Sequence, residues 1–213
     1  MTVYTRYGKR ILDIILSLLG MIVLSPLFLG LVIAVKLDSR GPAVFRQKRV
    51  GIRKSHFNIV KFRTMRIDTP KDVPTHLLKD PGRWITPMGR FLRKTSLDEL
   101  PQLWHIFTGK MSVVGPRPAL WNQDDLIAER DKYGANDIRP GLTGWAQVNG
   151  RDALEIPDKA KLDGEYARNV SIKMDWICLT KTVRHVLRRS GVIEGGTGSV
   201  RREQAHNSEE IEG

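Results

Sequence analysis

The chain is almost free of cysteine: Cys178 is the only one among its 213 residues. An intrachain disulfide is therefore excluded, and nothing implies an oxidising compartment. Trp176, Ile177 and Leu179 give Cys178 an apolar, helical context, which favours a buried and inert thiol over a reactive one. The five histidines are scattered along the sequence, so no Cys/His metal-ligand cluster is expected.

Acidic residues are also scarce, with 23 Asp and Glu against 35 Lys and Arg. The net charge is +12 and the isoelectric point is about 10.1. A surplus of this size favours an anionic partner, which can be nucleic acid, anionic lipid or a phosphorylated substrate. The length suits one domain with an anchor.

Long apolar runs are absent except over residues 11–35, which carry one charge, Asp13. A spanning helix needs about 20 apolar residues, so this run is long enough to cross a bilayer. A signal peptide has a shorter apolar region and a small-residue cleavage site, and neither fits. Arg6, Lys9 and Arg10 precede the run, and a basic stretch over residues 36–66 follows it. Because basic flanks mark the cytoplasmic side of a membrane, both ends of the run predict that side.

The pair Ser25-Pro26 lies inside this apolar run. Proline removes a backbone donor and kinks a helix. At about 1.5 Å per residue, neither half crosses a bilayer alone. One interpretation is a re-entrant hairpin with both ends on the cytoplasmic face. The other is an ordinary kinked span, since membrane helices tolerate proline. The residues alone leave both open.

The rest of the chain predicts a mainly α fold with a small β-hairpin. Three parts are expected: a membrane helix over 1–40, a cytoplasmic-face domain over 41–190 and a polar, disordered tail over 191–213. The hairpin pairs residues 43–47 with 57–62. Helices are predicted over 98–109, 119–133, 157–169 and 171–190, and loops over 67–81 and the glycine-rich 139–151. The last helix has an apolar stripe that fits either a membrane surface or the domain core. The stripe comprises Ile172, Trp176, Leu179, Val183 and Leu187.

Adjacent carboxylates, Asp98 and Glu99, stand where a helix is predicted to begin. Pro101 suits the first turn of that helix if Asp98 is its N-cap. The free N–H groups of a helix N-terminus attract anions, and Arg93 and Arg117 would meet a phosphate there. Purely structural interpretations stay open for each feature. Asp98 can be a simple capping residue, and the Gly-Pro-Arg-Pro sequence around Arg117 can be a rigid turn.

Lys61 and Arg63 can likewise form a solvated basic edge. Two other functional classes also remain at this point. A membrane-tethered nucleic-acid binder accounts for the positive charge, but it leaves the apolar run and the carboxylate pair unused. A structural membrane scaffold would need no catalysis.

Several long motifs in a fixed order carry a resemblance. They are KRILDIILSLLGMIVLSPLF at 9–28, GPAVFRQKRVG at 41–51, KFRTM at 61–65, RKTSLDELPQLWHIFTGKMSVVGPRP at 93–118 and RPGLTGWAQVNGR at 139–151. Over residues 6–189 the sequence resembles the bacterial sugar transferase family, the small monotopic phosphoglycosyl transferases. The resemblance implies a re-entrant helix broken at Ser25-Pro26, membrane-surface helices around the site, and a place on the cytoplasmic face of the bacterial inner membrane.

The resemblance also implies an activity and roles for residues. Members transfer a phosphosugar from a UDP-sugar to a polyprenyl phosphate such as undecaprenyl phosphate, and they release UMP. Asp98 would be the nucleophile of a two-step reaction, and Glu99 would help hold Mg²⁺. Arg93 and Arg117 would contact phosphate oxygens, with Lys61 and Arg63 as weaker candidates. Residues expected along the nucleotide region are Arg139, Thr143, Gln147 and Arg151.

Nucleic acid is not expected among the partners, whereas the bilayer is. A nearer rival is a glycosyl transferase that moves only the sugar and so releases UDP. The sugar, the glycoconjugate pathway and the residues that recognise uridine cannot be read from the sequence. The oligomeric state also stays open, a homo-oligomer included.

Overall fold

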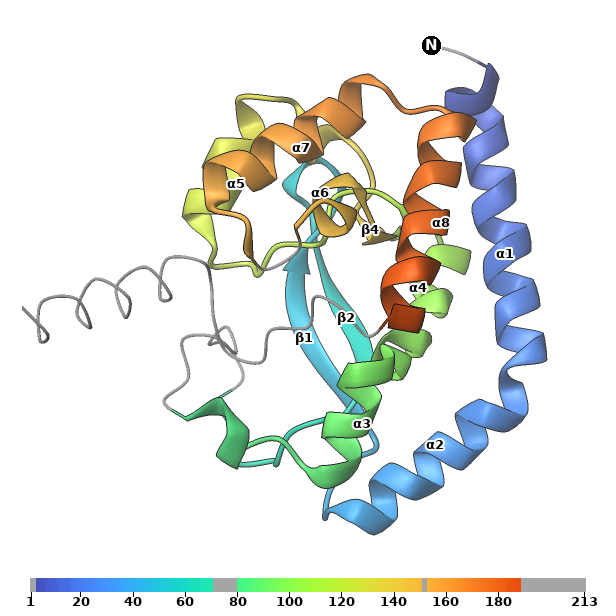
Figure 1. Ribbon diagram of the computed structural model, residues 1–213, viewed down its shortest axis with the longest axis vertical. Helices are drawn as coiled ribbons and strands as arrows, with labels where there is room; N and C mark the ends of the chain where they lie inside the picture. Colours follow the sequence, from blue (N-terminus) through green and yellow to red (C-terminus); the bar gives the residue numbers. More distant parts are fainter. Residues whose placement is uncertain (1–2, 71–79, 151–152, 189–213) are drawn as a thin grey trace, which may run out of the picture.

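The computed structural model describes residues 3–70, 80–150 and 153–188 (Figure 1). The chain begins with a π-helical turn, Tyr4–Gly8, that continues into α1 (Lys9–Val23) and α2 (Ser25–Asp38). No single helix in these ranges is long and apolar enough to span a bilayer. Tyr4–Val23 and Ser25–Asp38 together meet that requirement by length and composition, and they are bent by 63°. The predicted break is therefore present, and Pro26 stands in the first turn of α2, where its missing N–H costs no hydrogen bond.

Helix α1 has its polar residues inside and its apolar residues outside. Asp13 and Ser17, one turn apart, are buried against the domain, and Asp13 accepts hydrogen bonds from the Val113 amide at 2.8 Å and Ser112 Oγ at 3.1 Å. Exposed apolar side chains cover the opposite face, among them Ile15 and Ile22. An apolar outer face around a polar inner stripe is typical of a helix that contacts lipid.

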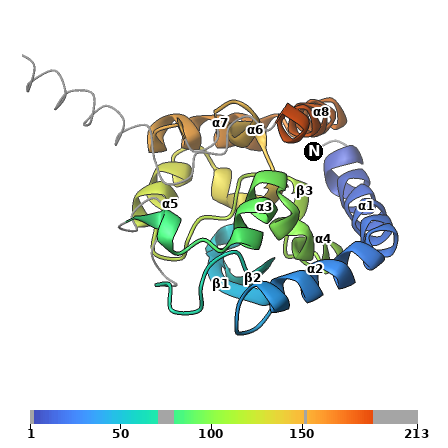
Figure 2. The same ribbon diagram turned by 60° about the horizontal axis from the view of Figure 1, so that its bottom comes forward.

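The predicted hairpin is confirmed, with β1 (Val44–Val50) antiparallel to β2 (His56–Phe62). Its first strand extends to Val50, beyond the predicted end. One core cluster contains Val35 of α2, Phe62 of β2 and Leu92 of α3 (Pro87–Thr95). This cluster fixes the second half of the bent pair on the domain. In the view of Figure 2, α2 runs beside the β1–β2 hairpin.

The region predicted as one helix from Asp98 to Gly109 has two parts: a 3-10 helix, Leu97–Gln102, and α4 (Leu103–Phe107). Asp98 is not the N-cap. That position belongs to Ser96, whose positive φ of 57° turns the chain from α3 into the 3-10 helix. Pro101 lies inside the 3-10 helix.

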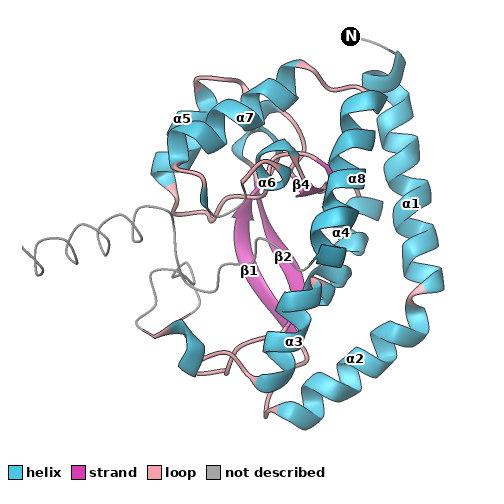
Figure 3. Ribbon diagram, viewed as in Figure 1, coloured by secondary structure: helices cyan, strands magenta, loops and turns pink. Residues whose placement is uncertain are grey.

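The glycine-rich stretch predicted as a loop instead forms β4 (Gly141–Thr143) and a short helix, α6 (Trp145–Val148). Strand β4, which is labelled in Figure 3, pairs in parallel with β3 (Ser112–Val114). The glycines are needed because backbones meet there: a Cβ on Gly141 would lie 2.1 Å from the Gly115 nitrogen. Glycine content therefore reflected close strand packing and not an irregular loop.

Three helices complete the domain: α5 (Asp124–Asp131), α7 (Ile156–Arg168) and α8 (Ile172–Arg188). The last two agree with the prediction. Helix α5 is shorter than the predicted 119–133, because Leu120 forms a β-bridge with Arg49. Cys178 of α8 is buried in a core cluster, as predicted. Of the predicted stripe, Leu179 packs against that cluster, while Ile172, Trp176 and Val183 are exposed. The predicted tail, 191–213, lies outside the described residues.

Candidate active site

Glu99 is the centre of a cluster of charged side chains from three segments. Lys61 on β2 lies 2.8 Å from Glu99 Oε1, and Arg117 Nη2 lies 2.6 Å from the same oxygen. Arg117 Nη1 reaches the second oxygen, Oε2, at a longer 3.4 Å. Burial opposes ionisation of Glu99, but Arg117 and Lys61 outweigh it and hold the pKa of that carboxyl well below its usual range. Glu99 is therefore an ionised carboxylate tied to two cations.

Asp98, the adjacent residue, has a different environment. Its side chain is 9% exposed, and among the described residues no hydrogen-bond or ion-pair partner directly contacts its carboxylate. Burial raises the pKa of Asp98 and so does Glu99, while Lys61, Arg93 and Arg117 act in the opposite direction. Asp98 is thus a buried carboxylate surrounded by cations without being bonded to one. Such a group keeps its oxygens available for reaction.

The structure separates the predicted phosphate-binding residues into two groups. Arg93 lies near enough to Asp98 to lower its pKa, and Arg93 Nε donates to Thr64 Oγ1 at 3.0 Å. Lys61 and Arg117 are in the cluster itself. Arg63 is not: it is buried and donates to backbone carbonyls at the end of α2, including that of Ser39 at 2.6 Å. The structure therefore gives Arg63 a role in holding the bent helix pair, because it satisfies carbonyls that a helix end leaves unpaired.

Arg49 is a member of the site that sequence reasoning missed. It donates to the Pro118 carbonyl at 3.1 Å, and its charge acts on both Arg117 and Glu99. Burial, and next the nearby Arg117, lower the pKa of Arg49 to about 9, against the opposing effect of Glu99. Its motif, GPAVFRQKRVG, was recognised, but several basic residues in it looked equivalent. Only pairing of the strands shows which of them faces the carboxylates.

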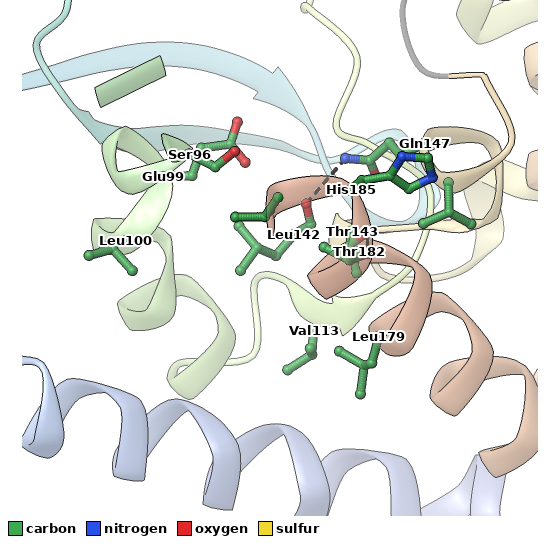
Figure 4. Close-up of a pocket in the computed structure, with 12 residues that line it drawn as sticks. Ser96, Glu99, Leu100, Val113, Leu142, Thr143, Gln147, Leu179, Thr182 and His185 are labelled. Carbon is green, nitrogen blue, oxygen red and sulfur yellow. Dashed lines mark hydrogen bonds between the residues drawn. The ribbon is translucent and has the colours of Figure 1, made fainter. Parts of the chain in front are cut away.

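A pocket lies next to Glu99, between the 3-10 helix and α8 (Figure 4). Its polar lining includes two of the predicted nucleotide-region residues, Thr143 and Gln147, together with Thr182 and His185. The apolar part of the wall comes from Leu100, Val113, Leu142, Val148, Leu179 and Val186. Gln147 donates to the Leu142 carbonyl at 3.2 Å, and Thr143 and Thr182 share a hydrogen bond of 2.7 Å.

The other two predicted nucleotide-region residues are not in this pocket's lining. Arg139 donates to the Gly109 carbonyl at 3.0 Å from an exposed position. Arg151 lies outside the described residues.

A carboxylate such as that of Glu99 suits Mg²⁺, which prefers oxygen ligands. No group of three or more His, Cys, Asp or Glu in the described part of the chain is arranged to hold a metal ion. In phosphoryl-transfer sites, however, Mg²⁺ takes only one or two carboxylates and completes its shell with substrate phosphates and water. Glu99 supplies one such carboxylate, since its Oε2 has only the longer contact with Arg117.

Fold and site together define a class of protein: a small domain docked on a bent apolar helix pair, with a buried carboxylate among cations suited to phosphates. The chain belongs to the bacterial sugar transferase family, which matches it over residues 4–189. The resemblance seen in the motifs is thereby confirmed.

Individual relatives cover the chain to different extents. An uncharacterized sugar transferase of Bacillus subtilis, EpsL, is 38% identical over 184 residues, which are 86% of this chain and 89% of the relative. The UDP-glucose:undecaprenyl-phosphate glucose-1-phosphate transferase of Escherichia coli is 39% identical, over 80% of this chain and 38% of the relative. The undecaprenyl-phosphate galactose phosphotransferase of Salmonella typhimurium is 36% identical, over 88% of this chain and 42% of the relative. The chain thus spans about two fifths of these two relatives.

Proposed function

We propose that this protein transfers a sugar 1-phosphate from a UDP-sugar to undecaprenyl phosphate and releases UMP. The names of the Escherichia coli and Salmonella relatives support this donor and acceptor chemistry. The observation that carries the proposal is the unpaired Asp98 carboxylate beside the Glu99 cluster. A site that only bound phosphate would need the cations, but it would gain nothing from a second buried acid.

The reaction would proceed in two displacements at one phosphorus atom. In the first, an Asp98 carboxylate oxygen attacks the phosphorus that carries the sugar, and the bond from that phosphorus to the bridging oxygen breaks. UMP leaves with that oxygen, and the sugar phosphate stays on Asp98 as an acyl phosphate. In the second, a phosphate oxygen of the lipid attacks the same phosphorus and Asp98 leaves as a carboxylate. One nucleophile can thus serve first a soluble donor and then a lipid acceptor.

The residues around Asp98 would do electrostatic work. Arg117 and Arg93 would bind phosphate oxygens, and Lys61 would offset charge next to Asp98 while it holds Glu99 in place. Glu99 would help hold Mg²⁺, which when bound neutralises the charge of the diphosphate. All these groups are fixed before the substrate arrives, so little reorganisation is needed during the reaction.

The bent helix pair would be a re-entrant anchor that keeps the site at the membrane surface on the cytoplasmic face. Arg10 supports this placement by binding the Ile106 and Phe107 carbonyls at the end of α4, both at 2.6 Å, so that the anchor and the catalytic segment move as one. The exposed Trp176 and Ile172 of α8 add apolar area that suits the interface. The apolar wall of the pocket beside Glu99 suits the first part of a lipid acceptor.

Capture of the adduct tests the activity. Purified protein is incubated with Mg²⁺ and a panel of UDP-sugars without acceptor, and UMP and protein-bound sugar phosphate are measured. We expect about one UMP per active protein, a stoichiometric adduct, and turnover only after undecaprenyl phosphate is added. Asp98→Asn should form no adduct, while Asp124→Asn, an exposed acid on α5, should behave as the parent does. Release of UDP would point to transfer of the sugar alone, and full activity of Asp98→Asn would end the nucleophile assignment.

Cysteine labelling tests the re-entrant anchor. Thr2→Cys is made in a Cys178→Ser background and exposed to a membrane-impermeant maleimide from either face of sealed vesicles. We expect labelling from the cytoplasmic face, the same face that labels a cysteine placed at Ser39. Labelling of the two positions from opposite faces would show that the pair crosses the bilayer.

A further inference from the structure

Arg49 is placed to control the segment that carries Arg117. It stands near the end of β1 and uses both terminal nitrogens: Nη1 donates to the Pro118 carbonyl at 3.1 Å, and Nη2 donates to Gln47 Oε1 at 2.6 Å. Its Nε is buried and has no hydrogen-bond partner among the described residues. The guanidinium is thus held as a fork whose direction is set by two acceptors.

The backbone around Arg49 holds the same segment. The Val50 amide donates to the Ala119 carbonyl at 3.0 Å, and Arg49 forms a β-bridge with Leu120. Arg117 stands between two prolines, Pro116 and Pro118, whose rings fix their own φ angles and restrict the residue before each. A chain this stiff passes on a constraint: when the Pro118 carbonyl is fixed, the backbone of Arg117 is fixed with it.

The charge of Arg49 has a consequence that a neutral clamp would not have. Arg49 and Arg117 repel each other and Glu99 attracts both, which is visible in the opposing effects on the pKa of Arg49. Arg49 thus joins Lys61 and Arg117 around Glu99, and together with Arg93 these cations outnumber the two carboxylates of the site, Glu99 and Asp98. The excess positive charge is stabilised when an anion enters the site.

We propose that Arg49 is a positioning residue for the transfer reaction: through the Pro118 carbonyl it holds Arg117 against Glu99, and it adds a third cation to the place that receives the donor diphosphate. The kinetic part of this inference rests on the proposed function. The structural part does not, because the contact between Arg49 and the Pro116–Pro118 turn exists in the protein without substrate.

Two substitutions separate the fork from the charge. Arg49→Gln removes both, and we expect kcat/KM for the UDP-sugar in the UMP-release step to fall about 10²-fold, the size of effect that misplacement of a binding group produces. Arg49→Lys keeps the charge but cannot span two acceptors, so KM should recover while kcat stays low. Arg46→Gln is the matched control, since Arg46 is on the same strand with an exposed side chain. It should leave both constants unchanged.

A double-mutant comparison shows whether Arg49 acts through Arg117. If it does, Arg49→Lys, which keeps the charge, should cost less than threefold more in an Arg117→Gln background, because the group that Arg49 positions is already gone. If the fold-losses of the two single substitutions multiply in the double mutant, Arg49 does not act through Arg117 and its assignment as a positioning residue is wrong. A purely structural defect lowers the active fraction, and with it the apparent kcat, by the same factor in every background, and it leaves KM unchanged.

Hydrogen exchange provides a readout that needs no activity. Amides of residues 112–123 should exchange faster than in the parent in both Arg49→Gln and Arg49→Lys. In Arg46→Gln their exchange rates should equal those of the parent. Should Arg49→Gln fail to fold, Arg49→Lys carries this measurement alone. Unchanged exchange would overturn the positioning role. If the parent protein releases no UMP but the Arg49 variants still exchange faster, the proposed function is wrong and the positioning contact of Arg49 stands.

Discussion

Two buried acidic sites can be compared in this molecule, one around Asp98 and Glu99 and one around Asp175 on α8. Each combines burial with a lysine partner: Lys61 lies 2.8 Å from Glu99, and Lys9 lies 2.6 Å from Asp175. At Asp175, both oxygens are bonded to the protein, Oδ2 to Lys9 and the Tyr4 hydroxyl and Oδ1 to the Tyr166 hydroxyl. At the other site, Glu99 is bonded in this way but its neighbour Asp98 is not.

The difference teaches that burial of an acid does not by itself identify a reactive one. Asp175 joins the start of the bent helix pair to α7 and α8, and its bonds are all used for that purpose. Burial of an unbonded carboxylate costs free energy, and a fold retains such a cost most readily where a ligand or a reaction needs the group. The carboxylate oxygens that lack hydrogen-bond partners, more than the charge of the group, therefore identify Asp98 as the candidate reactive acid.

The sharpest way to break this comparison is to neutralise each acid in turn. Asp98→Asn should lower UMP release by on the order of 10³-fold or more, because an amide cannot act as the nucleophile. Its stability should be equal or higher at neutral pH. The pKa of Asp98 is raised in the folded state, so ionisation favours the unfolded state, and that cost is fully present above the folded pKa.

Asp175→Asn should give the reverse pattern. The amide keeps one acceptor oxygen and puts a donor in place of the other, so Lys9 loses its charged partner and at least one of the three donors loses its acceptor, at a cost of about 3 kcal/mol. Thermal melting in detergent micelles should show the loss, while the protein that remains folded still forms the phosphosugar adduct. A stable, inactive Asp175→Asn, or an unstable Asp98→Asn, would contradict the division between the two sites.

Glu99→Gln should have the next largest effect. The amide leaves Lys61 and Arg117 without a charged partner and removes one carboxylate from the proposed Mg²⁺ site, so turnover should fall about 10²-fold. A Mg²⁺ titration of UMP release should show a higher half-saturating concentration than in the parent. A matched control is Glu129→Gln on α5, whose partner Lys132 is exposed. An unchanged Mg²⁺ requirement would leave Glu99 with an electrostatic role and no metal.

Elements with strong periodicity were predictable from the sequence. Helices α7 and α8, the hairpin and the break at Ser25-Pro26 all follow from side-chain spacing or proline geometry, and each is present. Parallel pairing of β3 with β4 was not predictable, because each strand has three residues and their partners are far apart in sequence. In such short strands the glycines that permit close packing look the same as the glycines of a loop.

The candidate site shows the same limit. The motifs identified Asp98, Glu99 and Arg117, and the structure brings them together with Lys61. Arg63, two residues from Lys61, is instead directed to the carbonyls at the end of α2. Strand alternation alone would place residues 61 and 63 on the same face. They differ because Arg63 lies beyond the end of β2, where the carbonyls at the end of α2 bind its guanidinium. Arg49 was missed for the same reason, since its role depends on a contact across 69 positions of sequence.

The smallest effect expected is a shift in pH dependence, and it tests whether Asp98 is the group that must ionise. Because burial raises the pKa of Asp98, the acid limb of kcat/KM for UMP release should lie above the usual aspartate range. Arg93 opposes that shift, so Arg93→Gln should move the limb further upward, whereas Arg90→Gln, an exposed cation on the same helix, should not. Glu99 has a lowered pKa and would give a limb far below that range. A limb that Arg93→Gln leaves in place would therefore assign the ionising group to a residue other than Asp98.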